Sequence, residues 1–214
     1  MCVIAAASTS SSRAKGSRRR QRPSSRERLL ASATHLFTTE GIRVIGIDRI
    51  LREADVAKAS LYSLYGSKDA LVIAYVRALD ESWRTRYAER ISDLSDPKSK
   101  ILAMFDQAIA DQPESEYRGS HFHNAANEYP KPDTDSERGI VEAVREHRRW
   151  LLDTLTTLLT ELNGYPGLTQ ARQLLVLLDG GYAGCRIERS TMPLEIAKEL
   201  AKSLLGAPPA DYCI

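Results

Sequence analysis

The chain has 214 residues, of which 43% are hydrophobic, so it can bury the core of one small and one larger domain. No apolar run approaches the ~18 residues that a membrane-spanning helix needs, which argues against a membrane protein. The net charge of +2 hides an asymmetry, because residues 1–28 hold eight Lys or Arg against one acid, a charge of +7, which leaves −5 for the remainder.

The first 24 residues are dominated by Ser, Ala and Arg and show no apolar periodicity. Such a segment cannot offset the entropy of ordering, so we expect residues 1–24 to form a disordered basic arm. Basic arms commonly track DNA phosphates or enter the minor groove, and the alternative is a solvated tail that aids solubility. The positive charges follow the short apolar start instead of preceding it, which is the wrong order for a secretory signal.

The three cysteines, Cys2, Cys185 and Cys213, are an odd number and show no CxxC spacing. This usage is typical of a reducing compartment and not of a disulfide framework. We therefore expect a cytoplasmic protein.

Residues 41–69 predict two short helices joined by a tight turn, after a first helix that begins near Ser24 or Ser25 and ends at Gly41. The first of the two helices has one apolar face, formed by Ile47, Ile50, Leu51 and Ala54. Asp55 and Val56 supply the turn, and the second short helix begins at Lys58. Small and polar side chains at its start would let it approach base edges in the ~12 Å major groove of DNA. Residues 25–70 thus predict a helix-turn-helix DNA-binding domain.

This stretch resembles the amino-terminal domain of the TetR family of transcriptional regulators over about 48 residues, from Arg26 to Ile73. The pattern G-x5-I-x2-I-x3-A-x-V-x-K-x2-L-Y-x2-Y-x-S-K-x2-L is carried by Gly41, Ile47, Ile50, Ala54, Val56, Lys58, Leu61, Tyr62, Tyr65, Ser67, Lys68 and Leu71. The resemblance implies that the Tyr62 hydroxyl meets the DNA backbone and that Lys68 contacts a phosphate. Lys58, Ala59 and Ser60 match positions that vary with the operator.

The full set of predicted DNA contacts is Arg26, Arg43, Gly46, Lys58, Ala59, Ser60, Tyr62, Ser63, Tyr65 and Lys68. One departure from the family concerns the entry to the helix near Ile47, where the family usually has Thr or Ser. Ile45 and Gly46 stand there instead, so a hydroxyl that would cap the helix and bond a phosphate is missing. Gly46 can still cap through its backbone.

The remaining chain is helical in pattern, with helices expected at residues 68–92, 97–113, 120–129, 134–162, 168–189 and 193–205. The fold class is therefore all-α, with about nine helices: a three-helix head, and a larger body over residues 71–207 before a tail at 208–214. In proteins that this chain resembles, the body binds a small-molecule ligand and forms a dimer. The first body helix is long enough to connect the head to the body.

Residues 117–129, YRGSHFHNAANEY, resemble the body of a TetR-like subgroup that includes regulators of drug-efflux genes. That pattern is nearer to RGCPF-x-N-A-x2-E, and here Ser120 and His121 replace the Cys and Pro, which rules out a thiol-based signal at that position. Aromatic, soft and polar residues on central helices are candidates for an effector pocket, although each also fits an ordinary core position. They are Trp83, Tyr87, Met104, Phe105, Phe122, His123, Trp150, Tyr182 and Arg186.

The helix at residues 168–189 is apolar on every side, so it must be buried all round or lie in an interface. Small residues follow within it and permit a close helix approach. We expect the last two helices to form half of a four-helix dimer interface, the alternative being an ordinary monomer core. The predicted interface residues are Leu174, Leu178, Gly181, Gly184, Leu200 and Leu204. Two heads on a twofold axis would read a palindromic operator.

The function predicted from the sequence is a homodimeric repressor that a small-molecule ligand releases from double-stranded DNA, with repressor favoured over activator by the resemblance alone. We expect no cofactor, metal or membrane partner, and no phosphate loop or catalytic motif indicates an enzyme. One alternative is a metal sensor or enzyme using His121, His123 and Glu128, although the two rings stand about 200° apart on a helix. Another is non-specific DNA binding through the arm. Cys185 is a candidate redox sensor only if it is exposed.

Overall fold

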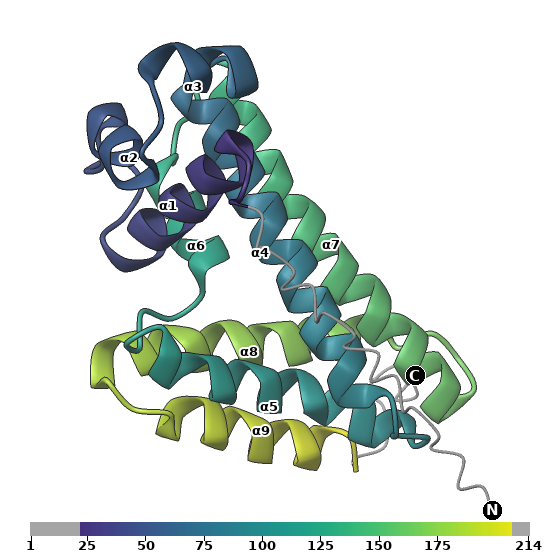
Figure 1. Cartoon of the computed structure of the whole chain (residues 1–214). Coiled ribbons are helices and arrows are strands. Elements are labelled where there is room, and N and C mark those ends of the chain that lie inside the picture. Colours follow the sequence, from purple (N-terminus) through teal and green to yellow (C-terminus); the bar gives the residue numbers. More distant parts are fainter. Residues whose placement is uncertain (1–21, 207–214) are drawn as a thin grey trace, which may run out of the picture.

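A computed structural model describes residues 22–206, which form nine α-helices and no strand (Figure 1). The helices are α1 (Ser25–Thr39), α2 (Ile47–Ala54), α3 (Lys58–Tyr65), α4 (Lys68–Ile91), α5 (Pro97–Glu114), α6 (His121–Glu128), α7 (Asp135–Asn163), α8 (Leu168–Glu188) and α9 (Met192–Leu204). The predicted all-α class is confirmed. The arm, apart from residues 22–24, and the tail at 208–214 lie outside the described residues.

The helices form two groups that share α4 and α7. In Figure 1 the head, α1 to α3, sits at one end of the long parallel pair α4 and α7, which both run from the head to the body, while α5, α8 and α9 lie across its other end. The short helix α6 lies below the head, between the two groups. Any movement of the body relative to the head therefore passes through α4, α6 or α7.

Local chemistry explains where the head helices begin and end. Ser24 and Glu27 form a capping box at the start of α1, with hydrogen bonds of 3.2 and 2.7 Å. Asp55 ends α2 in the left-handed conformation at φ 51°, which an Asp tolerates better than most residues. Gly41 lies two residues beyond the end of α1 at φ 112°, a backbone conformation that favours glycine.

The apolar interior consists of two clusters that a polar pair separates. The first joins the head to α6 and to the start of α7, through Phe122, Ala125 and Ile140, so it continues past the predicted boundary at residue 70. The second fills the body. Between them along α4 and α7, His147 Nδ1 lies 2.8 Å from Asp80 Oδ1, and the His147 ring stacks on Phe122 at 3.6 Å between centroids.

Helices α8 and α9 form a tight hairpin, and this hairpin uses residues that were predicted to contact a second subunit. A Cβ on Gly181 would lie 2.6 Å from Leu194, and a Cβ on Gly184 would lie 2.5 Å from Pro193. Leu174 and Leu178 are buried in the core of the same chain. Within the protomer, the close approach that Gly181 and Gly184 permit is to α9 of their own chain, and the two leucines are covered by their own core.

The other two predicted interface residues, Leu200 and Leu204, differ from each other. Leu200 is 52% exposed, whereas Leu204 packs against the body core. Within residues 22–206, none of the helices combines the length and the apolar character that crossing a membrane requires.

Candidate functional site

The outer face of α3 is the part of the head that is open to a binding partner. Lys58, Ala59 and Ser63 are exposed and Tyr62 is 47% exposed, while Leu61 on the opposite face is fully buried and anchors the helix. Lys58 Nζ lies 3.7 Å from Asp48 on α2, a distance at which both remain hydrated. Ser60 is half-buried. This face presents hydroxyls, small side chains and a cation whose one ion pair, with Asp48, is long and exposed to solvent.

Two predicted DNA contacts, Arg26 and Tyr65, also fasten α1 to α3. The Arg26 guanidinium donates to the carbonyl of Leu64 at 3.1 Å and lies 4.8 Å above the ring of Tyr65. In return the Tyr65 hydroxyl donates to the carbonyl of Arg26 at 3.0 Å. Burial raises the pKa of Tyr65 further above neutrality, so the hydroxyl is a donor at all physiological pH values. Their shared role is to set the position of α3.

Lys68 also has an internal partner. Its ammonium donates to the carbonyl of Ile42 at 2.7 Å and so ties α4 to the turn between α1 and α2. Burial lowers the pKa of Lys68, the cost of holding a cation in a half-buried site. A phosphate contact at this position is left to the two other N–H donors of the ammonium.

Sequence reasoning missed Arg28, which holds the helix-turn-helix angle. Its guanidinium donates to the carbonyls of Ala54 and Asp55 at 3.0 and 3.1 Å, and so satisfies the free carbonyl groups at the end of α2. A second guanidinium, that of Arg22, pairs with the Asp55 carboxylate. A contact between positions this far apart leaves no local pattern in the sequence, so it could not be predicted.

Glu128, the last residue of α6, binds the turn between α1 and α2. Its carboxylate accepts from the backbone N–H of Ile42 at 2.9 Å and from that of Arg43 at 2.6 Å. A Cβ on Gly41 would lie 3.2 Å from Glu128 Oε1, so glycine permits this close approach. We call this contact the Glu128 clamp.

The side chain of Arg43, another predicted DNA contact, belongs to the same junction. It lies 4.7 Å above the ring of Tyr129 and pairs with Glu137 on α7 at 3.1 Å. Arg118, before α6, donates to the carbonyl of Thr39 at 2.7 Å. Gly46, by contrast, is exposed at the start of α2 with extended backbone and no side-chain cap. The junction therefore joins the turn that precedes α2 to both α6 and α7.

Behind α6 the body encloses a small cavity of about 40 Å³. The residues around it come from α4, α5, α6, α8 and the segment before α6: Leu79, Trp83, Arg86, Asp111, Gln112, Ser115, Gly119, Ser120, His121, Phe122 and Tyr182. Three of the nine predicted pocket residues, Trp83, Phe122 and Tyr182, line it. Its remaining walls are more polar than the sequence indicated.

Several polar groups that line the cavity have a partner within it. Arg86 pairs with Asp111, although burial still raises the pKa of that carboxyl. Burial, helped by Arg118 and Arg86, lowers the pKa of His121 to about 4, so its ring is neutral at pH 7. Gln112 accepts from the backbone N–H of Gly119 at 3.2 Å. The cavity thus offers a neutral imidazole and an ion pair beside aromatic walls.

The other six predicted pocket residues do not border this cavity. Tyr87, Met104 and Phe105 are buried in the body core, and the Tyr87 hydroxyl donates to the carbonyl of Lys100 at 3.0 Å. Trp150 packs edge-on against Trp83. Apolar helix faces do not reveal which side chains border a void and which fill the core.

The last two, His123 and Arg186, face outward from the α6–α8 contact. His123 Nε2 lies 3.1 Å from Asp179, and Arg186 donates to the side-chain carbonyl of Asn124. These two pairs attach α6 to α8. They place α6 between the Glu128 clamp at its end and the body at its start.

The metal alternative does not fit this geometry. His121 faces the cavity, His123 pairs with Asp179 and Glu128 holds the head, so the three side chains serve different neighbours. Residues 22–206 contain no group of three His, Cys, Asp or Glu side chains that is arranged to hold a metal ion. Cys185 is buried, and burial raises the pKa of its thiol, the reverse of what a redox sensor needs.

Comparison with known proteins agrees with this arrangement of head and body. The family described as bacterial regulatory proteins, tetR family, matches residues 29–75. A TetR-family transcriptional regulator from Streptomyces coelicolor has a solved structure that is 32% identical, with 85% of this chain and 94% of that chain covered at a TM-score of 0.77. The structure of Escherichia coli NemR in its reduced form is 26% identical, covering 87% and 100% of the two chains at a TM-score of 0.73.

Among curated proteins, the HTH-type transcriptional regulator LmrA of Bacillus subtilis is 33% identical over 39% of this chain and 45% of its own length. The chain thus matches less than half of that relative. The HTH-type transcriptional repressor NemR of Escherichia coli is 25% identical over 86% of this chain and 94% of its own length. These relatives are named as regulators and not as enzymes.

Proposed function

Because the chain belongs to the TetR family of transcriptional regulators, and is thus a DNA-binding regulator, we propose that it is a homodimeric repressor that a small-molecule effector releases from a palindromic operator. The observation that supports this proposal best is the position of α6. This helix lines the effector cavity with His121 and Phe122 and grips the head through Glu128. A regulator of this kind acts where the DNA is, so we place it in the cytoplasm.

For DNA recognition we propose the exposed face of α3 and the start of α2. Lys58, Ala59 and Ser60 lie at the first turn of α3, where a helix in the major groove reaches base edges. Tyr62 and Ser63 are placed one turn later to meet phosphates. The free N–H groups that follow Gly46 are a further phosphate site that needs no side-chain hydroxyl.

For dimerisation we propose the outer face of the α8–α9 hairpin. Exposed apolar and small residues follow one another there at helical spacing: Val176, Gly180, Ala183 and Ile187 on α8, and Met192, Ile196 and Leu200 on α9. Exposed patches of this kind on a soluble protein mark interaction sites. A Cβ on Gly180 would meet no atom within 4 Å, so the glycine leaves room for a helix of a second copy. We call this surface the hairpin face.

The effector would act by changing the position of α6. A cavity of about 40 Å³ holds only a few water molecules, so a larger effector must displace the walls. The wall formed by α6 is the one whose far end holds the turn before α2. The effector shifts the equilibrium only if it binds the enlarged state more tightly than the DNA-binding state.

Selection of the purified protein on a random DNA library tests the proposal, followed by a salt titration of the winner against scrambled DNA. We expect a palindromic winner that is bound at least about 10³-fold more tightly than scrambled DNA. A winner without twofold symmetry would contradict the dimer. Equal loss of affinity on all DNA as salt rises would mean that only the basic arm binds.

A further inference from the structure

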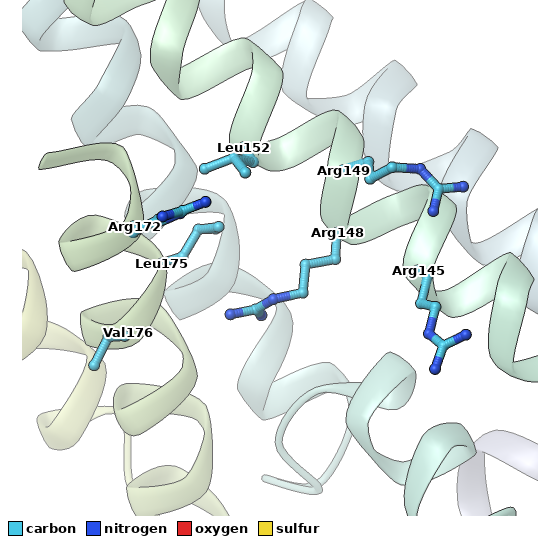
Figure 2. Close-up of a pocket in the computed structure, with 7 residues that line it drawn as sticks. All are labelled: Arg145, Arg148, Arg149, Leu152, Arg172, Leu175 and Val176. Carbon is cyan, nitrogen blue, oxygen red and sulfur yellow. The ribbon is translucent and has the colours of Figure 1, made fainter. Parts of the chain in front are cut away.

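A groove of about 480 Å³ runs between α7 and α8, apart from the cavity behind α6. Arg145, Arg148 and Arg149 of α7 and Arg172 of α8 line it. Figure 2 shows Arg148 and Arg172 reaching into the space between the two helices from opposite sides, with Arg145 and Arg149 along the rim of α7. Neither the effector cavity nor the DNA-binding face uses these residues.

The positive charge of the groove is only half balanced. Arg148 forms two hydrogen bonds with the Asp179 carboxylate, at 3.0 and 2.7 Å. Arg145 and Arg149 share one carboxylate, that of Glu142, at 3.6 and 2.7 Å. Four guanidinium groups therefore face two carboxylates, which leaves an excess of two positive charges.

Arg172 accounts for one of these excess charges. Among residues 22–206 it has no acidic partner within ion-pair distance and no hydrogen bond from its side chain to another residue. Its five N–H donors form the planar fork that binds a carboxylate through two parallel hydrogen bonds. Arg148, in contrast, is held in place by Asp179 and contributes its charge from a fixed position.

The floor of the groove is apolar. Leu152, Leu175 and Val176 form it, and Val176 is 65% exposed. A ligand that covers them gains the free energy of removing apolar surface from water, which a bare inorganic anion cannot do. The volume falls within the range of ~300–1,000 Å³ that is typical of small-molecule sites.

We propose that this groove binds a small amphipathic organic anion, with its carboxylate on Arg172 and its apolar body on Leu152, Leu175 and Val176. The site is separate from the effector cavity, and the proposal does not depend on the proposed repressor function. Val176 also belongs to the hairpin face, so the groove opens at the edge of that face. Acidic side chains of a second copy are the competing occupant, which the experiment distinguishes.

The test is isothermal titration of the full chain with four probes that separate charge from apolar body. Decanoate has both, decanamide lacks the charge, decylamine reverses it and acetate lacks the apolar body. We expect decanoate to bind at least about tenfold more tightly than each of the others, the value of one charge-assisted hydrogen-bond pair. Its affinity should fall as salt is added.

Arg172→Gln should weaken decanoate binding at least about tenfold. Arg77→Gln is the matched control, because Arg77 is an exposed arginine on α4, outside the groove. It should leave the affinity unchanged. Circular dichroism melting of both variants checks that they fold.

Several results would overturn the proposal. One is equal binding of decanoate, decanamide and decylamine, and another is an Arg172→Gln variant that binds decanoate as the unaltered chain does. A third is that no probe binds while Arg172→Gln shifts the monomer–dimer equilibrium, because the groove would then hold a second copy. None of these measurements contains DNA, so their outcome is independent of the DNA selection.

Discussion

Substitution by alanine at two adjacent glycines of α8, Gly180 and Gly181, should change the stability of the protomer in opposite directions. A Cβ on Gly180 would have no neighbour within 4 Å, so Gly180→Ala adds only helix propensity. We expect it to stabilise the folded protomer by about 0.5–1 kcal/mol. A Cβ on Gly181 would lie 2.6 Å from Leu194 Cδ2 and 3.1 Å from Leu194 Cα, so Gly181→Ala forces α9 to move.

The movement of α9 lowers the free energy of unfolding. Overpacking by one methyl group typically costs about 1–3 kcal/mol, from which the helix-propensity gain is subtracted. From the central values, about 2 kcal/mol of cost and somewhat under 1 kcal/mol of gain, we expect Gly181→Ala to destabilise the protomer by roughly 1 kcal/mol net. The two variants should differ by roughly 2 kcal/mol, or about 1 M in urea midpoint at an m-value near 2 kcal/mol/M.

Urea unfolding at protein concentrations low enough to keep the chain monomeric measures this difference. Sedimentation at higher concentration then reports the dimer, which Gly180→Leu should weaken because it fills the space left for a second copy. If Gly181→Ala proved as stable as the unaltered chain, the tight α8–α9 contact would be refuted. If Gly180→Leu left the dimer intact, the hairpin face would not be the interface.

Three further predictions concern the head, the clamp and the cavity. Tyr62→Phe should weaken binding to all DNA sequences alike, because a phosphate contact carries no sequence information. Lys58→Ala should instead alter the base preference in the DNA selection. The reverse pattern would make Lys58 the phosphate contact and Tyr62 the base contact. Glu128→Gln replaces a charged hydrogen-bond acceptor with a neutral one, which should weaken the Glu128 clamp by about 1–2 kcal/mol. The backbone amides of the turn before α2 should then exchange hydrogen faster. Unchanged exchange would show that the clamp does not hold this turn. Burial lowers the pKa of His121 in the folded state from 6.5 to about 4, so the unfolded chain binds the extra proton first as pH falls. The free energy of unfolding should therefore fall between about pH 6.5 and pH 4, by on the order of 2–3 kcal/mol at most. His121→Gln should lose less stability over this window, and equal pH profiles would count against a buried neutral ring.

Much of the head was predictable because its signals are local. The apolar spacing of Ile50, Leu51 and Ala54 predicts the buried face of α2, and the structure buries all three. The exposure of Lys58 and Tyr62 likewise follows from their register on α3. What the register does not reveal is a competing partner, and Arg26 has one in the carbonyl of Leu64.

The body was harder to predict because its chemistry depends on residues far apart in the chain. Arg86 and Asp111 pair across the wall of the cavity, and neither position carries a sequence signature. The run of small residues in α8 correctly indicated close helix packing. It did not indicate that Gly181 faces α9 while Gly180 faces outward, because one step along a helix turns the side chain by about 100°.

The continuity of the first apolar cluster from the head into α6 and α7 bears on how hybrid regulators should be built from this chain. Replacing only the DNA-reading residues, up to about residue 75, with those of another regulator would remove one half of a shared core. Phe122, Ala125 and Ile140 would then pack against side chains that do not fit them. A transplant that carries α6 and the first turns of α7 along with the head would keep that core whole. The pair of Asp80 and His147, which lies between the two apolar clusters, is then the best point in α4 and α7 at which to join the two sequences.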